Sequence, residues 1–149
     1  MIRKATLDDL DQLTNLFDQY LVFYKKPSDF EKHKSYLKER LENNEAIIFL
    51  AFDDELKKEA FGFTLIYPTF SSVRLSKILI LNDLFVNSTI RNNGVGEQLI
   101  NKTIELAKDV GADLVRLRTA KDNSIAQGLY HKMGFIRDEL YYTYDLVVE

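Results

Sequence analysis

The sequence contains no cysteine among its 149 residues. That absence excludes disulfide bonds, a thiol nucleophile and zinc sites built on thiolates, and it fits a reducing compartment. Only two histidines are present, and without cysteine partners they argue against a metal centre. The sequence therefore predicts a site that works without metal.

Long runs of one residue type are also missing. No block of Lys and Arg is present, and the formal net charge is −3, which argues against a nucleic-acid partner. No run approaches the roughly 18 apolar residues of a membrane span, and residues 1–6 lack the apolar core of a signal peptide. We therefore expect a soluble, cytoplasmic protein with no membrane partner.

The residues that are present predict one α/β (α+β) domain over residues 1–149. Hydrophobic residues make up 46% of the chain and charged residues 29%, as in ordinary globular proteins. Apolar runs and alternations predict strands, and apolar positions at helical spacing behind capping residues predict helices. Strands are expected near 1–5, 46–52, 61–67, 77–86, 114–119, 135–137 and 141–148, and helices near 10–21, 28–42, 95–110 and 124–133.

The transition from the strand at 77–86 to the helix at 95–110 is typical of an anion site. A polar loop rich in Asn and Gly joins them, and Gly94 and Gly96 would allow positive φ angles and a close approach of the backbone to a ligand. A helix N-terminus stabilises a phosphate through its free N–H groups and dipole. The alternative is a simple tight turn. Neither the Gly-Lys-Ser/Thr of a P-loop nor the third glycine of a dinucleotide fold is present.

Two motifs give this loop a more specific interpretation. Arg91-x-x-Gly94-x-Gly96 follows Asp83-Leu84-Phe85-Val86, and Asn123-Ser124-x-Ala126-x-x-Leu129-Tyr130-x-x-x-Gly134-Phe135 comes later in the chain. Together with the order of elements, they resemble the GNAT (Gcn5-related) N-acetyltransferase superfamily, including its diamine acetyltransferase-like members. The resemblance covers nearly the whole chain. It implies a mixed, mostly antiparallel sheet of about seven strands flanked by four helices and splayed between the fourth and fifth strands.

The resemblance also implies acetyl-CoA as co-substrate. The pantetheine arm would pair with the backbone of Leu84, Phe85 and Val86, beside an N–H that a bulge leaves free for the thioester oxygen, and Asn123 and Tyr130 would line its path. The alternative is that the side chains at 84–86 are core and that Asn123 is a helix cap. The pyrophosphate would lie on the loop residues Arg91, Asn92, Asn93, Gly94, Val95 and Gly96.

For catalysis, the resemblance implies that Tyr130 is the general acid for the leaving thiolate, because a phenol with an ordinary pKa near 10 is protonated at neutral pH. Relatives often carry a Glu base where this chain has Asn82. The neighbouring Asp83 is the candidate base, although in a regular strand it would point to the opposite face, and only a bulge would re-aim it. A water chain is the alternative route for the proton.

The acceptor is expected between the first two helices and the loop before the central strand. That region offers aromatic residues suited to an ammonium group or simply to packing, namely Tyr20, Tyr24, Tyr67 and Phe70. The expected function is transfer of an acetyl group to a primary amine of a small molecule by direct attack in a ternary complex. The alternatives are a protein lysine or N-terminal acceptor, or a silent coenzyme A-binding sensor. The resemblance also allows a homodimer.

Overall fold

The computed structural model describes residues 1–53, 59–87 and 94–149. The chain divides into two compact units, Met1–Arg118 and Thr119–Glu149. The single domain expected over residues 1–149 stays a prediction. None of the helices in the described ranges is long and apolar enough to cross a membrane.

The N-terminal unit is built on a sheet of five strands whose order in space is their order in the chain. Its strands are β1 (Ile2–Lys4), β2 (Ile47–Phe52), β3 (Ala60–Ser71), β4 (Ser76–Val86) and β5 (Ala112–Arg116). The first four pair as antiparallel neighbours, and β5 pairs parallel to β4. The predicted mixed, mostly antiparallel sheet is therefore confirmed.

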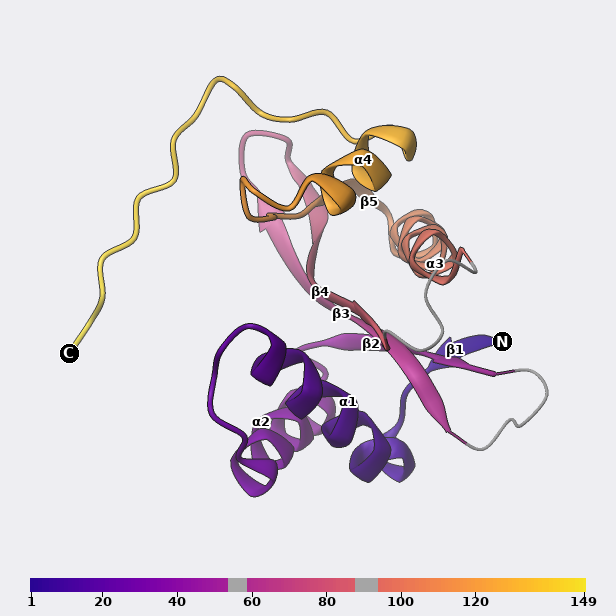
Figure 1. The fold of residues 1–149 in the computed structure, drawn as a ribbon. Helices are drawn as coiled ribbons and strands as arrows, with labels where there is room; N and C mark the ends of the chain where they lie inside the picture. The colour runs from indigo at the N-terminus through magenta and orange to yellow at the C-terminus, as the bar shows by residue number, and fades with distance from the viewer. Residues whose placement is uncertain (54–58, 88–93) are drawn as a thin grey trace. The chain divides into compact units, whose positions relative to one another are not determined.

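Three helices cover the two faces of this sheet (Figure 1). Helices α1 (Leu10–Phe23) and α2 (Phe30–Glu42), with the short 3-10 helix η1 (Leu7–Asp9) before them, lie on one face. Helix α3 (Val95–Val110) lies on the other. Strand side chains alternate between the two faces of the sheet. Phe63 of β3 therefore belongs to the core under α1 and α2, and Leu79 of β4 belongs to the core on the other face, where it is joined by Leu99 of α3.

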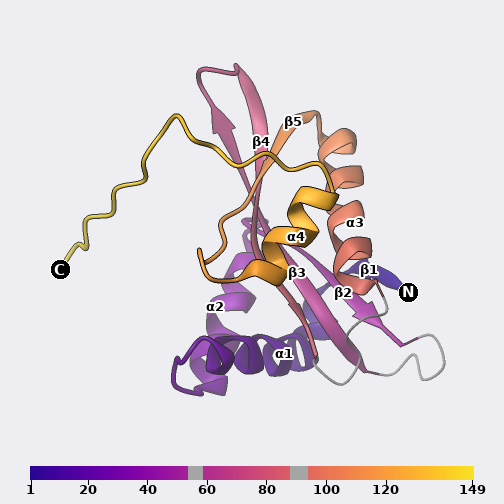
Figure 2. The same cartoon turned by 45° about the horizontal axis from the view of Figure 1, so that its top comes forward.

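The C-terminal unit contains one helix, α4 (Ser124–Lys132), followed by an extended segment. Residues 135–149 run without strand pairing (Figures 1 and 2). The strands predicted at 135–137 and 141–148 are therefore wrong for this structure, and the described residues form five strands rather than about seven. Apolar alternation favours an extended chain, but a strand also requires a hydrogen-bonding neighbour.

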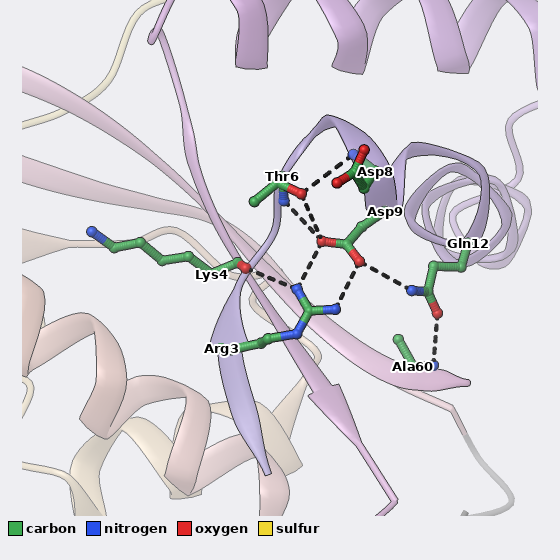
Figure 3. A network of polar contacts seen from close by, with 7 residues as sticks. All are labelled: Arg3, Lys4, Thr6, Asp8, Asp9, Gln12 and Ala60. Carbon is green, nitrogen blue, oxygen red and sulfur yellow. Dashed lines mark hydrogen bonds and ion pairs between the residues drawn. The ribbon is translucent and has the colours of Figure 1, made fainter. Parts of the chain in front are cut away.

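A polar network joins the first strand, the first helices and the sheet (Figure 3). The Arg3 guanidinium donates two hydrogen bonds of 2.8 Å to the carboxylate of Asp9, which also accepts the backbone N–H of Thr6. Gln12 donates to Asp9 at 3.3 Å and accepts the N–H of Ala60 at 3.2 Å. The Arg3 hydrogen bonds and the Thr6 N–H lower the pKa of Asp9 from 3.8 to about 2, although burial opposes the shift.

We expect Asp9→Asn to destabilise the fold at neutral pH and to lose that effect in acid. A carboxyl group whose pKa is lowered by folding contributes stability above its ordinary pKa and loses it as the pH falls toward the folded value. The lowered pKa of Asp9 corresponds to about 2 kcal/mol in the free energy of unfolding, after allowance for the half-exposed Arg3 partner. Urea unfolding at pH 6 and pH 2.5 measures it, with Asp8→Asn as the control. An equal loss of stability at both pH values would contradict the assignment.

Candidate active site

Strands β4 and β5 run together over only part of their length. Their parallel pairing extends from Lys77 opposite Ala112 to Ile80 opposite Arg116, where β5 ends. Strand β4 continues to Val86, so within the described residues none of the six positions after Ile80 has a ladder partner on the β5 side, and five of them pair with β3. The predicted divergence between the fourth and fifth strands is confirmed. It leaves a length of β4 backbone where an extended ligand could add as a strand.

A β-bulge lies where the divergence begins. Leu65 of β3 is opposite Asp83, but the next residue, Ile66, is opposite Leu81. Asn82 is therefore the extra residue of β4, and a bulge of this kind bends the strand and disrupts its ladder locally. The bulge was expected near Leu84 and Phe85, and the structure places it two residues earlier.

The bulge decides where Asp83 points. Leu65 and Phe63, which lie opposite Asp83 and Phe85, belong to the core under α1 and α2. Asp83 therefore faces that side of the sheet, and the Asn82 amide donates a 3.0 Å hydrogen bond to its carboxylate. The expectation for a regular strand, with Asn82 and Asp83 on opposite faces, does not hold here. Asp83 is half-buried. It lies next to Asn82, the position at which the resemblance implies a Glu base in relatives.

The three residues after Asp83 pack their side chains into the two cores, while their backbone has no ladder partner on the β5 side. Leu84 and Val86 pack against the core under α3, whereas Phe85 packs against the core under α1 and α2. On the β3 side they lie opposite Thr64, Phe63 and Gly62. Their side chains therefore stabilise the fold, and only their main chain is offered to a ligand.

The N-terminus of α3 provides the second feature of the site. Gly94 caps the helix with φ +71°, the left-handed conformation that glycine adopts without strain. The first bond of the helix runs from the N–H of Gln98 to the carbonyl of Gly94 at 3.0 Å, so the N–H groups of Val95 and Gly96 point out of its N-terminal end. Val95 itself is buried. A positive φ was expected at Gly96 as well, but Gly96 lies inside the first helical turn and does not have one. Arg91, Asn92 and Asn93 lie outside the described residues.

Aromatic side chains line the α1 side near Phe85. Tyr20 contacts the rings of Phe63 and Phe85 at centroid distances of 5.7 and 5.9 Å. Tyr24 contacts Tyr20 at 4.9 Å and is 49% exposed. Tyr20 is therefore mainly a packing residue, and Tyr24 is the more accessible of the two.

Tyr67 is joined by a residue that the sequence did not identify. Its hydroxyl lies 2.5 Å from the hydroxyl of Tyr36 on α2, and the Arg40 guanidinium lies 4.6 Å from the centre of the Tyr36 ring. Burial raises the pKa of Tyr67, and the hydrogen bond with Tyr36 and the charge of Asp83 raise it further. The Tyr67 phenol therefore stays protonated near neutral pH, and it can orient a ligand but not accept its proton. The sequence did contain a signal for Tyr36. It lies three residues after the half-buried His33 on the same helix, so both side chains lie on the same face of α2.

Phe70 does not join this group. It lies three residues beyond Tyr67, where the ladder is regular, so it points to the other face of the strand. It is 78% exposed and lines a surface hollow of about 490 Å³ at the tip of the β3–β4 hairpin. The structure thus separates Phe70 from Tyr20, Tyr24 and Tyr67.

The two predicted site residues of the C-terminal unit lie at opposite ends of α4. The Asn123 carboxamide oxygen accepts the N–H of Ala126 at 3.2 Å, so its role as a helix cap is confirmed. Tyr130 is half-buried near the other end, and its ring meets that of Phe135 at 5.8 Å. Their roles toward coenzyme and thioester stay predictions. No group of three metal-ligating side chains is found among the residues that the structure describes.

Comparison with known proteins decides the family. A family model described as "Acetyltransferase (GNAT) family" matches residues 10–135. The chain belongs to the GNAT acetyltransferase family. A GNAT relative from Bacillus subtilis, the uncharacterised N-acetyltransferase YhfO, is 40% identical over 147 residues, which cover 99% of this chain and 97% of the relative. The protein is accordingly an N-acetyltransferase.

Solved structures support the GNAT fold. The crystal structure of a probable acetyltransferase is 36% identical and superposes with a TM-score of 0.93, covering 100% of this chain and 98% of that one. The aminoglycoside acetyltransferase AAC(6')-Iy, in complex with the bisubstrate analogue CoA-S-monomethyl-acetylneamine, superposes with a TM-score of 0.81 over 99% and 98% of the two chains. At 22% identity, this second likeness shows the fold alone.

Proposed function

We propose that this GNAT enzyme transfers the acetyl group of acetyl-CoA to a primary amine of a small molecule, by direct attack within a ternary complex. The observation that carries the proposal is the free length of β4 beyond Ile80, with the N-terminus of α3 following it and Asp83 turned toward the aromatic side of the sheet. The backbone of Leu84 to Val86 fits an extended amide-bearing arm, and the first turn of α3 fits a pyrophosphate.

The chain's own groups would then perform the proton transfers. Acetyl-CoA supplies an acetyl group activated as a thioester. An alkyl amine has a pKa of about 10.4 and arrives protonated, so Asp83 is proposed to take its proton before the nitrogen attacks the thioester carbon. The tetrahedral adduct then collapses with cleavage of the carbon–sulfur bond, and Tyr130 is proposed to give its hydroxyl proton to the thiolate sulfur. The second proton of the attacking nitrogen, lost as the amide forms, returns through solvent to the Tyr130 oxygen and restores the phenol. A backbone N–H beside the bulge would stabilise the developing oxyanion, an effect typically worth about 100-fold to 1000-fold in rate.

The aromatic side of the sheet supports a small amine as acceptor. Tyr67, Tyr36 and the accessible Tyr24 offer hydroxyl groups and ring faces, and both attract an ammonium group. The solved AAC(6')-Iy complex contains an amino-sugar portion, which is consistent with this class of acceptor within the fold. We propose Tyr20, Tyr24 and Tyr67 as acceptor-binding residues and add Tyr36, because its hydroxyl is hydrogen-bonded to that of Tyr67. Phe70 points to the other face of β3 and is left out of this set.

Two-substrate initial-rate kinetics test this proposal. Direct attack in a ternary complex predicts intersecting double-reciprocal lines when acetyl-CoA and amine are varied. Polyamines, amino acids and aminoglycosides are expected to give higher kcat/KM than lysine-containing peptides or peptide N-termini. Parallel lines would contradict direct attack, and a preference for peptides would contradict the small-molecule acceptor.

We expect Asp83→Asn to remove the acidic limb of the pH profile of kcat/KM. The rate should then rise only as the amine itself loses its proton, because the carboxylate that accepts it is gone. Asp113→Asn on β5, which removes the partner of Arg74, is the control and should keep the wild-type profile. Profiles of the same shape for wild type and Asp83→Asn would assign the deprotonation to water or to the free amine.

Tyr67→Phe should raise the KM for the amine by roughly fivefold and leave kcat within about twofold, since one neutral hydrogen bond contributes about 1 kcal/mol. The motivation is the hydroxyl pair that Tyr67 forms with Tyr36 on the Asp83 side of the sheet. Steady-state kinetics with the best amine measure it, with the exposed Tyr142→Phe as control. An unchanged KM would remove Tyr67 from the acceptor site.

A further inference from the structure

Thr64 is the one polar residue in the buried stretch of β3 at residues 62–66. It is 0% exposed. A valine has the same shape and needs no hydrogen-bond partner, whereas a buried hydroxyl without a partner destabilises the fold. The hydroxyl of Thr64 has its partner outside its own strand, since it donates a 2.9 Å hydrogen bond to the backbone carbonyl of Asp83 on β4.

This contact differs from those of the other two fully buried threonines in the part of the chain that the structure describes. Thr14 and Thr103 each donate to the carbonyl four residues earlier in their own helix, at 2.7 and 3.0 Å. Such bonds follow from helix geometry alone. Thr64 instead connects two strands across 19 positions of the sequence, at the peptide that follows the extra residue Asn82.

The pairing of β3 with β4 shows which way the Asp83–Leu84 peptide points. The N–H of Asn87 donates to the carbonyl of Phe61 at 2.7 Å, and in an antiparallel ladder every second residue directs its N–H and C=O groups to the same neighbour. The register is regular from there back to Asp83, so Asp83 directs its carbonyl toward β3. The N–H of a trans peptide points opposite to its C=O. The N–H of Leu84 is therefore aimed away from β3, to the side where β5 has ended.

We propose that Thr64 is a positioning residue for acetyl transfer, because its hydroxyl holds the Asp83–Leu84 peptide with the N–H of Leu84 facing the thioester carbonyl. The inference rests on the proposed function, in which a backbone N–H beside the bulge stabilises the oxyanion. A bulge disrupts the ladder locally, so the peptide after Asn82 has less support than one inside a regular strand. Thr64 supplies that support from the face of the sheet that α3 covers, where its ladder partner Leu84 also packs.

The expected consequence is confined to the chemical step. A donor aimed at the developing charge accelerates a reaction most when its direction is fixed before the reaction begins. Without the Thr64 hydroxyl, the N–H of Leu84 is still present, but its peptide plane can tilt. The effect should therefore fall on kcat, with little change in how tightly either substrate binds.

Thr64→Val tests this role because it removes the hydroxyl and keeps the shape of the side chain. We expect kcat to fall on the order of 10-fold, with the KM for acetyl-CoA and for the amine within about twofold of wild type. Thr64→Ser restores the hydroxyl and should recover most of the lost kcat. Thr103→Val is the matched control, because it removes a buried hydroxyl that donates to a backbone carbonyl within α3, and it should keep the wild-type kcat.

Thermal unfolding checks that each variant is folded. A wild-type kcat in Thr64→Val overturns the proposal. So does an equal loss of kcat in Thr64→Ser and Thr64→Val, or in Thr103→Val and Thr64→Val, because the Thr64 hydroxyl would then not be the cause. If the wild type releases no thiol with any amine, the proposed acetyl transfer fails instead, and the role of Thr64 is decided by a measurement on bound acetyl-CoA alone.

The carbonyl stretch of bound acetyl-CoA provides that measurement without an acceptor. A hydrogen bond polarises the thioester carbonyl and lowers its stretching frequency. Difference infrared spectroscopy with acetyl-CoA carrying carbon-13 at the acetyl carbonyl should show a lower frequency on the wild type than in solution. The shift should shrink in Thr64→Val and return in Thr64→Ser, with Thr103→Val like the wild type. Equal frequencies on the wild type and Thr64→Val overturn the proposal, and no binding of acetyl-CoA to the wild type overturns the proposed function with it.

Discussion

Replacing Tyr130 by phenylalanine is expected to lower kcat by about 100-fold or more while the affinity for acetyl-CoA stays near that of wild type. A positioned general acid typically contributes 100-fold to 10,000-fold, and the substitution removes the phenolic proton and little else. The motivation is the place of Tyr130 in the motif that runs from Asn123 to Phe135 and that the family match covers. Steady-state kinetics and isothermal titration with acetyl-CoA measure the two quantities separately.

The control for this variant is Tyr141→Phe, because Tyr141 lies in the extended segment after α4 and is 80% exposed. It should keep the wild-type kcat. The affinity measurement guards against a merely structural effect, since the Tyr130 ring contacts Phe135 and phenylalanine preserves that contact. An unimpaired kcat in Tyr130→Phe would mean that water or another group protonates the thiolate.

Gly96→Leu is expected to abolish the stabilisation that acetyl-CoA gives the wild type. A ligand that binds only the folded state at 100 times its Kd stabilises it by ~2.7 kcal/mol, which thermal unfolding detects readily. Gly96 lies in the first turn of α3, where its N–H points out of the helix end. In the proposed coenzyme site, a leucine side chain at that turn would occupy the space of the pyrophosphate.

The apo protein provides an internal check on this variant. Leucine and alanine favour a helix more than glycine does, so both Gly96→Leu and Gly96→Ala should raise the free energy of unfolding without ligand by about 0.5–1 kcal/mol. The alanine variant should keep part of the acetyl-CoA effect because its side chain is small. If the leucine variant binds acetyl-CoA as tightly as wild type, the first turn of α3 is not part of the coenzyme site.

Local sequence patterns predicted the parts of the fold that depend on neighbouring residues. The glycine before α3 and the cap at Asn123 are both confirmed. Gly94 supplies the left-handed conformation at the start of the helix, and the Asn123 side chain accepts a backbone N–H three residues ahead. The apolar run of β4 was equally recognisable, because a buried central strand needs side chains of this kind on both faces.

Features set by pairing between distant segments could not be predicted in the same way. The bulge at Asn82 exists because β4 has one residue more than β3 between matched positions, and a single strand does not show that difference. The contact of Tyr36 with Tyr67 joins residues 31 positions apart. Residues 135–149 show the converse case, since their alternation predicts strands but does not supply the neighbour that a strand requires.

Release of thiol from acetyl-CoA, followed across a panel of amines, is the decisive measurement of amine acetylation by this protein. We expect release that depends on the protein and on an amine, with one N-acetyl product per thiol by mass spectrometry. The rate should fall about 100-fold in Tyr130→Phe. It should become undetectable in Gly96→Leu at the acetyl-CoA concentration used for the wild type. Bound acetyl-CoA with no amine-dependent release from polyamines, amino acids, aminoglycosides or peptides would contradict it.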